Sequence, residues 1–151
     1  MMMNETNALA RALAKKFGFH PIEAERAWEV DATFDFLYEQ WNFIGPPTVE
    51  KQTDEETAEK YFAAVERICD EMSAKLEKNK TKFLCGDRMT VCDFQMAHLR
   101  WTYFENHLVQ TGDFYTVKSM EMIAKREVLK AYYERLFKEL KPILDARKPS
   151  P

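Results

Sequence analysis

The sequence predicts an all-α domain, a bundle of about five to six helices. Apolar side chains recur at three- and four-residue spacing over most of the chain, and no segment alternates at period two as a half-buried strand does. Glycine, with 4 residues in a chain of 151, is too scarce for a turn-rich β architecture. Hydrophobic residues make up 46% of the chain, which is enough for one domain with a continuous core.

The first expected helix covers residues 8–17 and ends at Gly18, a residue type that commonly terminates helices. Glu5 and Thr6 lie just ahead of it. We expect Thr6 to cap this helix and Glu5 to lie near the positive end of its dipole. One face of the helix is apolar and carries Leu9, Leu13 and Phe17.

The second expected helix covers residues 22–43, with Pro21 suited to its first turn, and stops before the Gly-Pro-Pro sequence at 45–47. Its apolar positions recur at three and four residues and are Ala27, Val30, Phe34, Leu37, Tyr38 and Trp41. A row of carboxylates recurs on the same helix at four-residue spacing, and we expect it to face solvent. This row consists of Asp31, Asp35 and Glu39.

Two residue pairs have the spacing of a capping box, in which a hydroxyl and a carboxylate bond to the backbone N–H groups of one another's residues. Thr53 with Glu56 predicts the start of a third helix, which runs to about residue 79. Thr90 with Asp93 predicts the start of a fourth, and we expect this structural capping box to open the central helix of the core. The apolar stripe behind it is Ala97, Trp101, Phe104 and Leu108.

The C-terminal third of the chain is expected to hold two more helices. A break at 111–116 precedes a short helix at 117–125 and a longer one at 127–140. Pro142 ends or restarts the last helix.

Charge and hydropathy exclude several classes of partner. The 22 basic and 25 acidic residues give a net charge of −3, and no basic block stands out, so we expect neither nucleic acid nor an anionic membrane surface. No apolar run approaches the roughly 20 residues that span a bilayer. The N-terminus lacks the basic-then-apolar order of a secretory signal, and we therefore expect a cytoplasmic protein.

The three cysteines are Cys69, Cys85 and Cys92. Their odd number and the absence of a CxxC motif argue against a disulfide framework and against a zinc site. We expect reduced thiols, with Cys69 and Cys92 as small core residues. Cys85, in the turn ahead of the central helix, is the only one expected to be reactive.

Chemical motifs are otherwise sparse. The sequence has no HExxH, no GxGxxG, no phosphate-binding loop and no GxSxG, and its histidines are not spaced as a metal pair. We expect no metal site. The residues taken by themselves identify no catalytic group.

Residues 82–94, KFLCGDRMTVCDF, resemble the segment that closes a turn and opens the central helix in the C-terminal domain of cytosolic glutathione transferases. The family pattern there is "fL.Gd..T.aD", and Cys92 stands where the family usually has alanine. Residues 129–147 resemble the family's last helices, and residues 5–18 resemble the segment that ends its glutathione-binding domain. The three segments follow one another in the family's order.

The resemblance implies two parts: residues 1–18 as the last helix of the thioredoxin-like glutathione-binding domain, and residues 19–151 as the helical domain. It implies a detoxification reaction in which glutathione, a co-substrate rather than a bound cofactor, is conjugated to a small hydrophobic electrophile. It also implies a homodimer that pairs the helices expected at 22–43 and 53–79. The family's thiol-activating residue has no counterpart in this chain, so the catalytic residue is unknown.

Site residues are carried over by position. Glu5 and Thr6 match the family's pair that binds the γ-glutamyl end of glutathione, and Glu39 lies near an acidic position that some classes supply from the partner subunit. The family lines its electrophile pocket with the first helix of this domain and with the C-terminal helices. The candidates here, each of which also suits a core or interface position, are Tyr38, Trp41, Phe104 and Tyr115.

Three functions remain open at this point. The chain is part of a glutathione-conjugating enzyme, or a non-catalytic interaction module of the kind that organises translation-factor and synthetase complexes, or a helical domain without a ligand. The presence of Glu5 and Thr6 favours the enzyme. The lack of a thiol-activating residue favours the other two for this chain by itself, and whether the missing half is genuine stays undecided.

Overall fold

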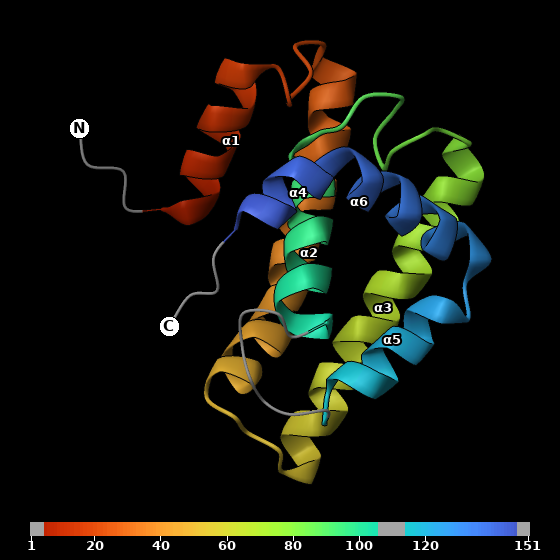
Figure 1. The fold of residues 1–151 in the computed structure, drawn as a ribbon. Helices are drawn as coiled ribbons and strands as arrows, with labels where there is room; N and C mark the ends of the chain where they lie inside the picture. The colour runs from red at the N-terminus through yellow and green to blue at the C-terminus, as the bar shows by residue number, and fades with distance from the viewer. Residues whose placement is uncertain (1–4, 106–113, 148–151) are drawn as a thin grey trace.

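The computed structural model describes residues 5–105 and 114–147, and within these ranges it is helical, with no strand (Figure 1). This confirms the predicted all-α bundle. The elements are α1 (Thr6–Phe17), α2 (Ala24–Val49), α3 (Glu55–Asn79), α4 (Val91–His98), the π-helix η1 (Leu99–Phe104), α5 (Thr116–Ala124) and α6 (Glu127–Ala146). No helix in the described part of the chain is both long and apolar enough to cross a membrane.

Helix α4 lies in the middle of the bundle, with the long helix α2 behind it and α6 across it (Figure 1). It contacts α1, α2, η1 and α6. Its core-facing residues are buried, and they are Val91, Cys92, Asp93, Met96 and Ala97. The expectation of a central helix opened by Thr90 is therefore confirmed.

The predicted capping box forms at the start of α4. Asp93 is fully buried, and its carboxylate accepts hydrogen bonds from the Thr90 N–H at 2.8 Å and the Thr90 hydroxyl at 3.0 Å. It also accepts the Leu84 N–H at 3.2 Å and the Tyr132 hydroxyl at 2.9 Å. Burial raises the pKa of Asp93, and these donors hold it down in part. One carboxylate thus joins the preceding turn, the start of α4 and helix α6.

The other two predicted caps are wrong. Asp54, not Thr53, caps α3, because its carboxylate accepts the Thr57 N–H at 3.0 Å and leaves the adjacent Thr53–Glu56 pair outside the cap. At α1 the cap position is Glu5, whose side chain makes no capping bond, and Thr6 is already the first helical residue. The predicted stop at Gly18 is confirmed, with φ at 78° in the left-handed region.

The predicted end of α2 before residue 45 is wrong, since the helix continues through Pro46 and Pro47. Each proline removes one backbone donor. The segment remains helical because Ile44 and Thr48 are buried in the core, so packing outweighs the lost bonds. The Thr48 hydroxyl bonds to the Ile44 carbonyl at 2.6 Å, and the Glu50 N–H closes the last turn on the Pro46 carbonyl at 2.9 Å.

The C-terminal helices begin where the sequence predicts them, within about a residue. Helix α6, however, passes through Pro142 instead of ending there, because this exposed position loses a single backbone bond. Arg126 lies between α5 and α6 and ties their junction to α3. Its guanidinium pairs with Glu66 and Asp70, each at 2.5 Å.

The π-helix η1 changes the register of the stripe predicted behind the capping box. The Glu105 N–H bonds to the Arg100 carbonyl, five residues back, at 2.8 Å. Ala97 and Phe104 are buried as predicted, whereas Trp101 is half-buried. Leu108, the break at 111–113 and the tail at 148–151 lie outside the described residues.

Helix α1 is held on the bundle by charge. Arg11 pairs with Asp31 at 2.7 Å and with Asp35, and its guanidinium lies 5.0 Å from the centre of the Phe34 ring. The buried His20 ring lies 3.1 Å from the same Asp31 carboxylate oxygen. We predicted that the acidic row of α2 faces solvent. This is only partly correct, because two of its three carboxylates, Asp31 and Asp35, hold α1 through Arg11.

The apolar face of α1 points away from the bundle. Leu9, Leu13 and Phe17 are 40%, 46% and 63% exposed, while Ala14 on the opposite face is buried. A row of large apolar side chains that face solvent is unusual on a soluble domain. It identifies α1 as a helix with a second, uncovered packing surface.

Candidate functional site

A cavity of about 360 Å³ lies between α1, α2 and α4. Each helix contributes one face to it, because the lining residues recur at three- and four-residue spacing. The lining comprises Thr6, Asn7 and Ala10 of α1, Phe34, Tyr38 and Trp41 of α2, and Val91, Phe94, Gln95 and His98 of α4. Three sequence-predicted site residues, Thr6, Tyr38 and Trp41, therefore meet in one place.

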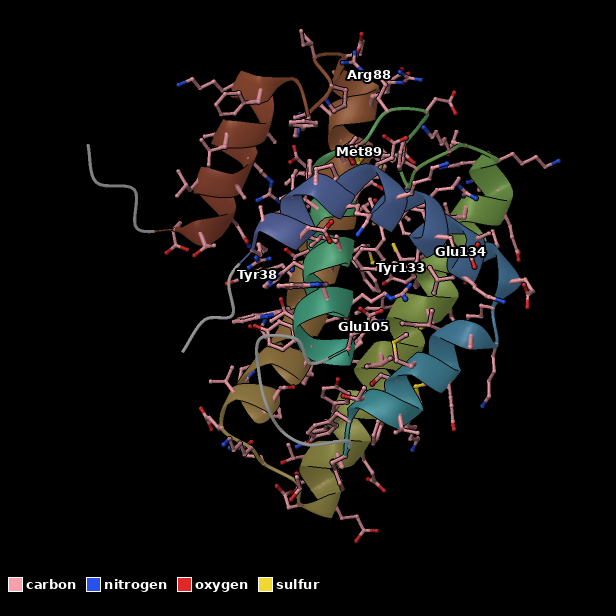
Figure 2. The ribbon with its side chains drawn as sticks, in the orientation of Figure 1. Tyr38, Arg88, Met89, Glu105, Tyr133 and Glu134 are labelled. Atoms are coloured by element: carbon pink, nitrogen blue, oxygen red, sulfur yellow. The ribbon has the colours of Figure 1, made fainter. Side chains whose placement is uncertain are left out.

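The two large aromatic side chains of the cavity form one surface. Tyr38 and Trp41 stack with ring centres 5.6 Å apart and planes inclined by 20°. Figure 2 shows Tyr38 on the side of the bundle that faces α1. Gly45 allows this arrangement, because a Cβ atom at that position would lie 2.5 Å from the Trp41 ring. The ring thus packs directly on the backbone of the next helical turn.

The polar groups of the cavity are few. The His98 Nδ1 atom lies 3.1 Å from the Thr102 hydroxyl, which fixes the ring. Burial and the charge of Arg147 lower the pKa of His98, so the imidazole is uncharged at neutral pH. Gln95 adds an amide. An apolar wall with a few fixed polar groups is the usual form of a site for a small hydrophobic molecule.

Glu5 and Thr6 lie at the start of α1, and Thr6 is one of the residues that line this cavity. Both are exposed, and they begin α1, where the first backbone N–H groups have no partner within the helix and suit a carboxylate. Thr6 adds its hydroxyl to the cavity lining, while Glu5 does not line it. Glu39 follows Tyr38 on α2 but is exposed and outside the lining. The site therefore has an apolar interior and a polar rim at the start of α1.

Two predicted pocket residues belong to the core instead. Phe104 is fully buried in η1. Tyr115 is fully buried too, stacks on Tyr61 with ring centres 4.0 Å apart, and donates its hydroxyl to the Gln52 carbonyl. Neither is among the residues that line the cavity, and neither η1 nor α5 contacts α1.

The cavity residues on α4 were missed by sequence reasoning. Val91, Phe94, Gln95 and His98 follow the spacing of a single helical face, so a pattern was present. It was obscured by the apolar stripe predicted on the adjoining face of the same helix, which begins at Ala97. Among the described residues, no group of three or more His, Cys, Asp or Glu side chains is arranged to hold a metal ion.

Comparisons with known proteins support this reading of the fold. The family model described as "Glutathione S-transferase, C-terminal domain" matches residues 35–141. The solved structure of the glutathione S-transferase Blo t 8 superposes with a TM-score of 0.71 at 21% identity, over 95% of this chain and 63% of that one. A glutathione S-transferase of Caenorhabditis elegans gives a TM-score of 0.70 at 22% identity, over 97% of this chain and 69% of that one.

These matches differ in what they show. At such identities the two structures establish the fold, and the chain spans less than two thirds of the length of Blo t 8. No curated protein sequence matches the chain. The family model covers most of the chain, including α3, α4 and α5. The chain therefore belongs to the glutathione S-transferase family, by way of that family's C-terminal helical domain.

Proposed function

We propose that this chain is the helical half of a glutathione-conjugating enzyme and that the α1–α2–α4 cavity takes a small hydrophobic electrophile. The observation that carries the proposal is the meeting of Thr6 with Tyr38 and Trp41 around one cavity. An exposed helix start suits the γ-glutamyl carboxylate of glutathione, and the aromatic interior suits an aryl group. Glu39, exposed outside the cavity, would reach glutathione only at a partner subunit's site.

The apolar face of α1 supports a two-part organisation. We propose that Leu9, Leu13 and Phe17 pack against a thioredoxin-like glutathione-binding domain, with residues 1–18 as its last helix and residues 19–151 as the helical domain. That domain would supply the donor that lowers the pKa of the glutathione thiol. A free thiol, with a pKa near 8.5, is only a few per cent ionised at neutral pH. We place the enzyme in the cytoplasm, where glutathione is reduced and abundant.

Electrophile binding is tested with the purified chain, a nitroaryl halide and tryptophan fluorescence. Trp41 lines the cavity, whereas Trp28 is 73% exposed elsewhere on α2. Trp41 therefore reports binding in the cavity, and Trp28 serves as the control outside it. We expect the Trp28→Phe protein to keep saturable quenching and the Trp41→Phe protein to lose it. Equal loss in both variants, or quenching that never saturates, would place the halide outside the cavity.

Conjugation is tested with the same halide, which changes absorbance when glutathione displaces its halogen. We expect no appreciable turnover from this chain alone, since Glu5 and Thr6 would bind the γ-glutamyl end of glutathione and position nothing at its sulfur. Fusion of a glutathione-binding thioredoxin-like domain that lacks its own last helix, ahead of Glu5, should produce turnover. Robust turnover by the chain alone that Thr6→Ala abolishes would contradict the proposal, and would point to Tyr38 as the thiol-activating group.

A homodimer through α2 and α3 is the second part of the proposal. Trp28, far too exposed for a core residue, lies beside a groove of about 450 Å³ between these helices. We expect the wild-type chain to sediment as a dimer at micromolar concentration and Trp28→Ala to weaken it. Phe114→Ala, at an exposed aromatic residue outside the groove, is the control. A monomer throughout would refute the dimer.

The same exposed surfaces favour a second candidate, a non-catalytic interaction module. A module would use the faces around Trp28 and Phe17 and would leave the α1–α2–α4 cavity without a ligand. The two candidates are therefore separated by the quenching experiment. Saturable, Trp41-dependent binding supports the enzyme, and its absence in a folded dimer supports the module.

A further inference from the structure

We propose that Cys85 and Cys92 are a reversible redox pair, which forms an intramolecular disulfide when the protein meets a hydroperoxide. The two Sγ atoms lie 4.0 Å apart, close enough for a thiol–thiol contact and not bonded. The sequence did not suggest this pair, because the two cysteines are seven positions apart and form no CxxC motif. The turn and the first turn of α4 bring them together.

Their positions allow the sulfur atoms to meet. A disulfide requires an S–S distance of about 2.05 Å, so the two atoms must approach by about 2 Å. Cys85 lies in the turn closed by the Phe83–Gly86 bridge, and Gly86 has a φ of 140° that only glycine adopts readily. Cys92 sits on the rigid start of α4. The approach is therefore a movement of the Cys85 turn toward a fixed partner.

Cys85 is buried, with 9% of its surface exposed, and a small oxidant would approach it through the cavity that it lines. It forms part of the wall of a cavity of about 440 Å³, between the α1–α2 connection and the turn that precedes α4. Figure 2 shows Arg88 and Met89, two other wall residues, at the end of the bundle where α2 begins. Lys15 and Arg26 also line this cavity, as do the acidic Glu23 and Asp87. A hydroperoxide is small and neutral enough to enter it.

The two thiols are unequal, which assigns their roles. The hydrogen bond between the two thiols lowers the pKa of Cys85, burial opposes this, and the charge of Lys75 adds to the lowering. The bond to Cys85 together with burial raises the pKa of Cys92. Cys85 lines the cavity and Cys92 does not, and the thiolate is the nucleophile, so Cys85 attacks the peroxide and Cys92 resolves the product.

The chemistry balances in two steps. The Cys85 thiolate attacks one peroxide oxygen, the O–O bond breaks, and the departing hydroxide takes up the thiol proton as water. This oxidises Cys85 to a sulfenic acid and reduces the peroxide. The Cys92 sulfur then attacks the Cys85 sulfur, the S–S bond forms, the S–O bond breaks, and a second water leaves with the Cys92 proton. Two thiols and one hydroperoxide give one disulfide, one water and one further water or alcohol.

Cys69 provides an internal control. It is buried in α3, and burial raises the pKa of its thiol to about 12. Its thiolate is therefore almost absent at neutral pH. We expect Cys69 to react with peroxide at least about tenfold more slowly than Cys85.

The experiment treats the intact chain with a small excess of hydrogen peroxide and then alkylates the remaining thiols. Trypsin cleaves after Arg88, so a Cys85–Cys92 disulfide joins the peptides FLCGDR and MTVCDFQMAHLR. We expect this linked pair, with the mass of the intact chain lowered by two hydrogens and only Cys69 alkylated. Dithiothreitol should restore all three thiols. Linkage through Cys69, linkage between chains, or unreacted thiols would overturn the proposal.

Two variants assign the steps, each checked for folding by circular dichroism. Cys92→Ala should stop at the Cys85 sulfenic acid, which dimedone captures. Cys69→Ala, the matched control, should form the disulfide at the wild-type rate. Capture of Cys69 instead of Cys85 in the Cys92→Ala protein would refute the assignment of Cys85 as nucleophile.

Discussion

Asp93→Ala is expected to be among the most damaging single changes in this protein. The carboxylate is buried and accepts the N–H groups of Thr90 and Leu84 and the hydroxyl groups of Thr90 and Tyr132. Alanine leaves at least two buried backbone donors and the Tyr132 hydroxyl without an acceptor. At about 1–3 kcal/mol for each of these three unpaired groups, the loss is on the order of 3–9 kcal/mol. That is a large part of the roughly 5–15 kcal/mol that stabilises a domain.

Graded variants test this reasoning even if Asp93→Ala fails to fold. Tyr132→Phe removes one hydrogen bond without changing the shape of the core, and Thr90→Ala removes one hydroxyl, so each should cost about 1 kcal/mol. The Thr90→Ala/Asp93→Ala double variant should cost less than the sum, because both changes break one unit. Urea denaturation followed by circular dichroism measures all four. Wild-type stability for Thr90→Ala and Asp93→Ala would refute the role of the capping box, and electrophile quenching of folded Thr90→Ala should be unchanged.

Three further predictions concern the site and its supports. Gly45→Ala should cost about 1–3 kcal/mol by overpacking and shift the tryptophan emission, since the new methyl group meets Trp41; an unchanged spectrum would refute that contact. Burial by itself raises the pKa of Asp31, but the hydrogen bonds from His20 and Arg11 lower it by more, so the net effect is a decrease. Asp31→Asn should therefore destabilise the protein at neutral pH, and the difference should vanish as pH falls below about 4, through the folded pKa; a pH-independent difference would exclude the ion pair. Arg126→Met should lower the free energy of unfolding by up to about 1 kcal/mol, and this loss should be smaller at high salt, which screens the ion pairs; a loss that does not depend on salt would mean that Arg126 stabilises the protein by packing and not by its charge.

Local patterns predict the elements of this fold well when one signal dominates. The apolar stripe of α3 and the Thr90–Asp93 box have no competitor, and both form as expected. At residues 53–56 two caps compete, and Asp54 wins by one position. Which of two neighbouring residues caps a helix depends on a single hydrogen bond, and the sequence pattern does not show which of the two bonds is the more stable.

Long-range packing accounts for the larger errors. Pro46 and Pro47 are strong helix-breaking signals, yet α2 continues because Ile44 and Thr48 are buried in the core. The acidic row of α2 looked like a solvent-facing surface until Arg11, twenty residues away from Asp31, was found to pair with it. Neither fact can be read from residues adjacent in sequence.

The candidate site was predictable on one side only. The α2 face with Tyr38 and Trp41 was found through family resemblance, and the structure places both at the cavity with Thr6. Phe104 and Tyr115 come from elements that the same resemblance assigns to the pocket, yet here their side chains are buried in the core. An aromatic residue's type does not reveal which side of its helix is packed.

The fold and the site of this protein depend on different contacts, which makes them separable by mutation. Asp93 joins the preceding turn to α4 and α6, so its loss acts on the whole bundle. Asp31 joins α1 to α2 through Arg11, and α1 provides one wall of the cavity. Because α1 packs on the bundle mainly through these charges and one buried alanine, the cavity can lose a wall while the core stays intact. Electrophile binding should therefore respond to Asp31 more strongly than global stability does, and to Thr90 much less.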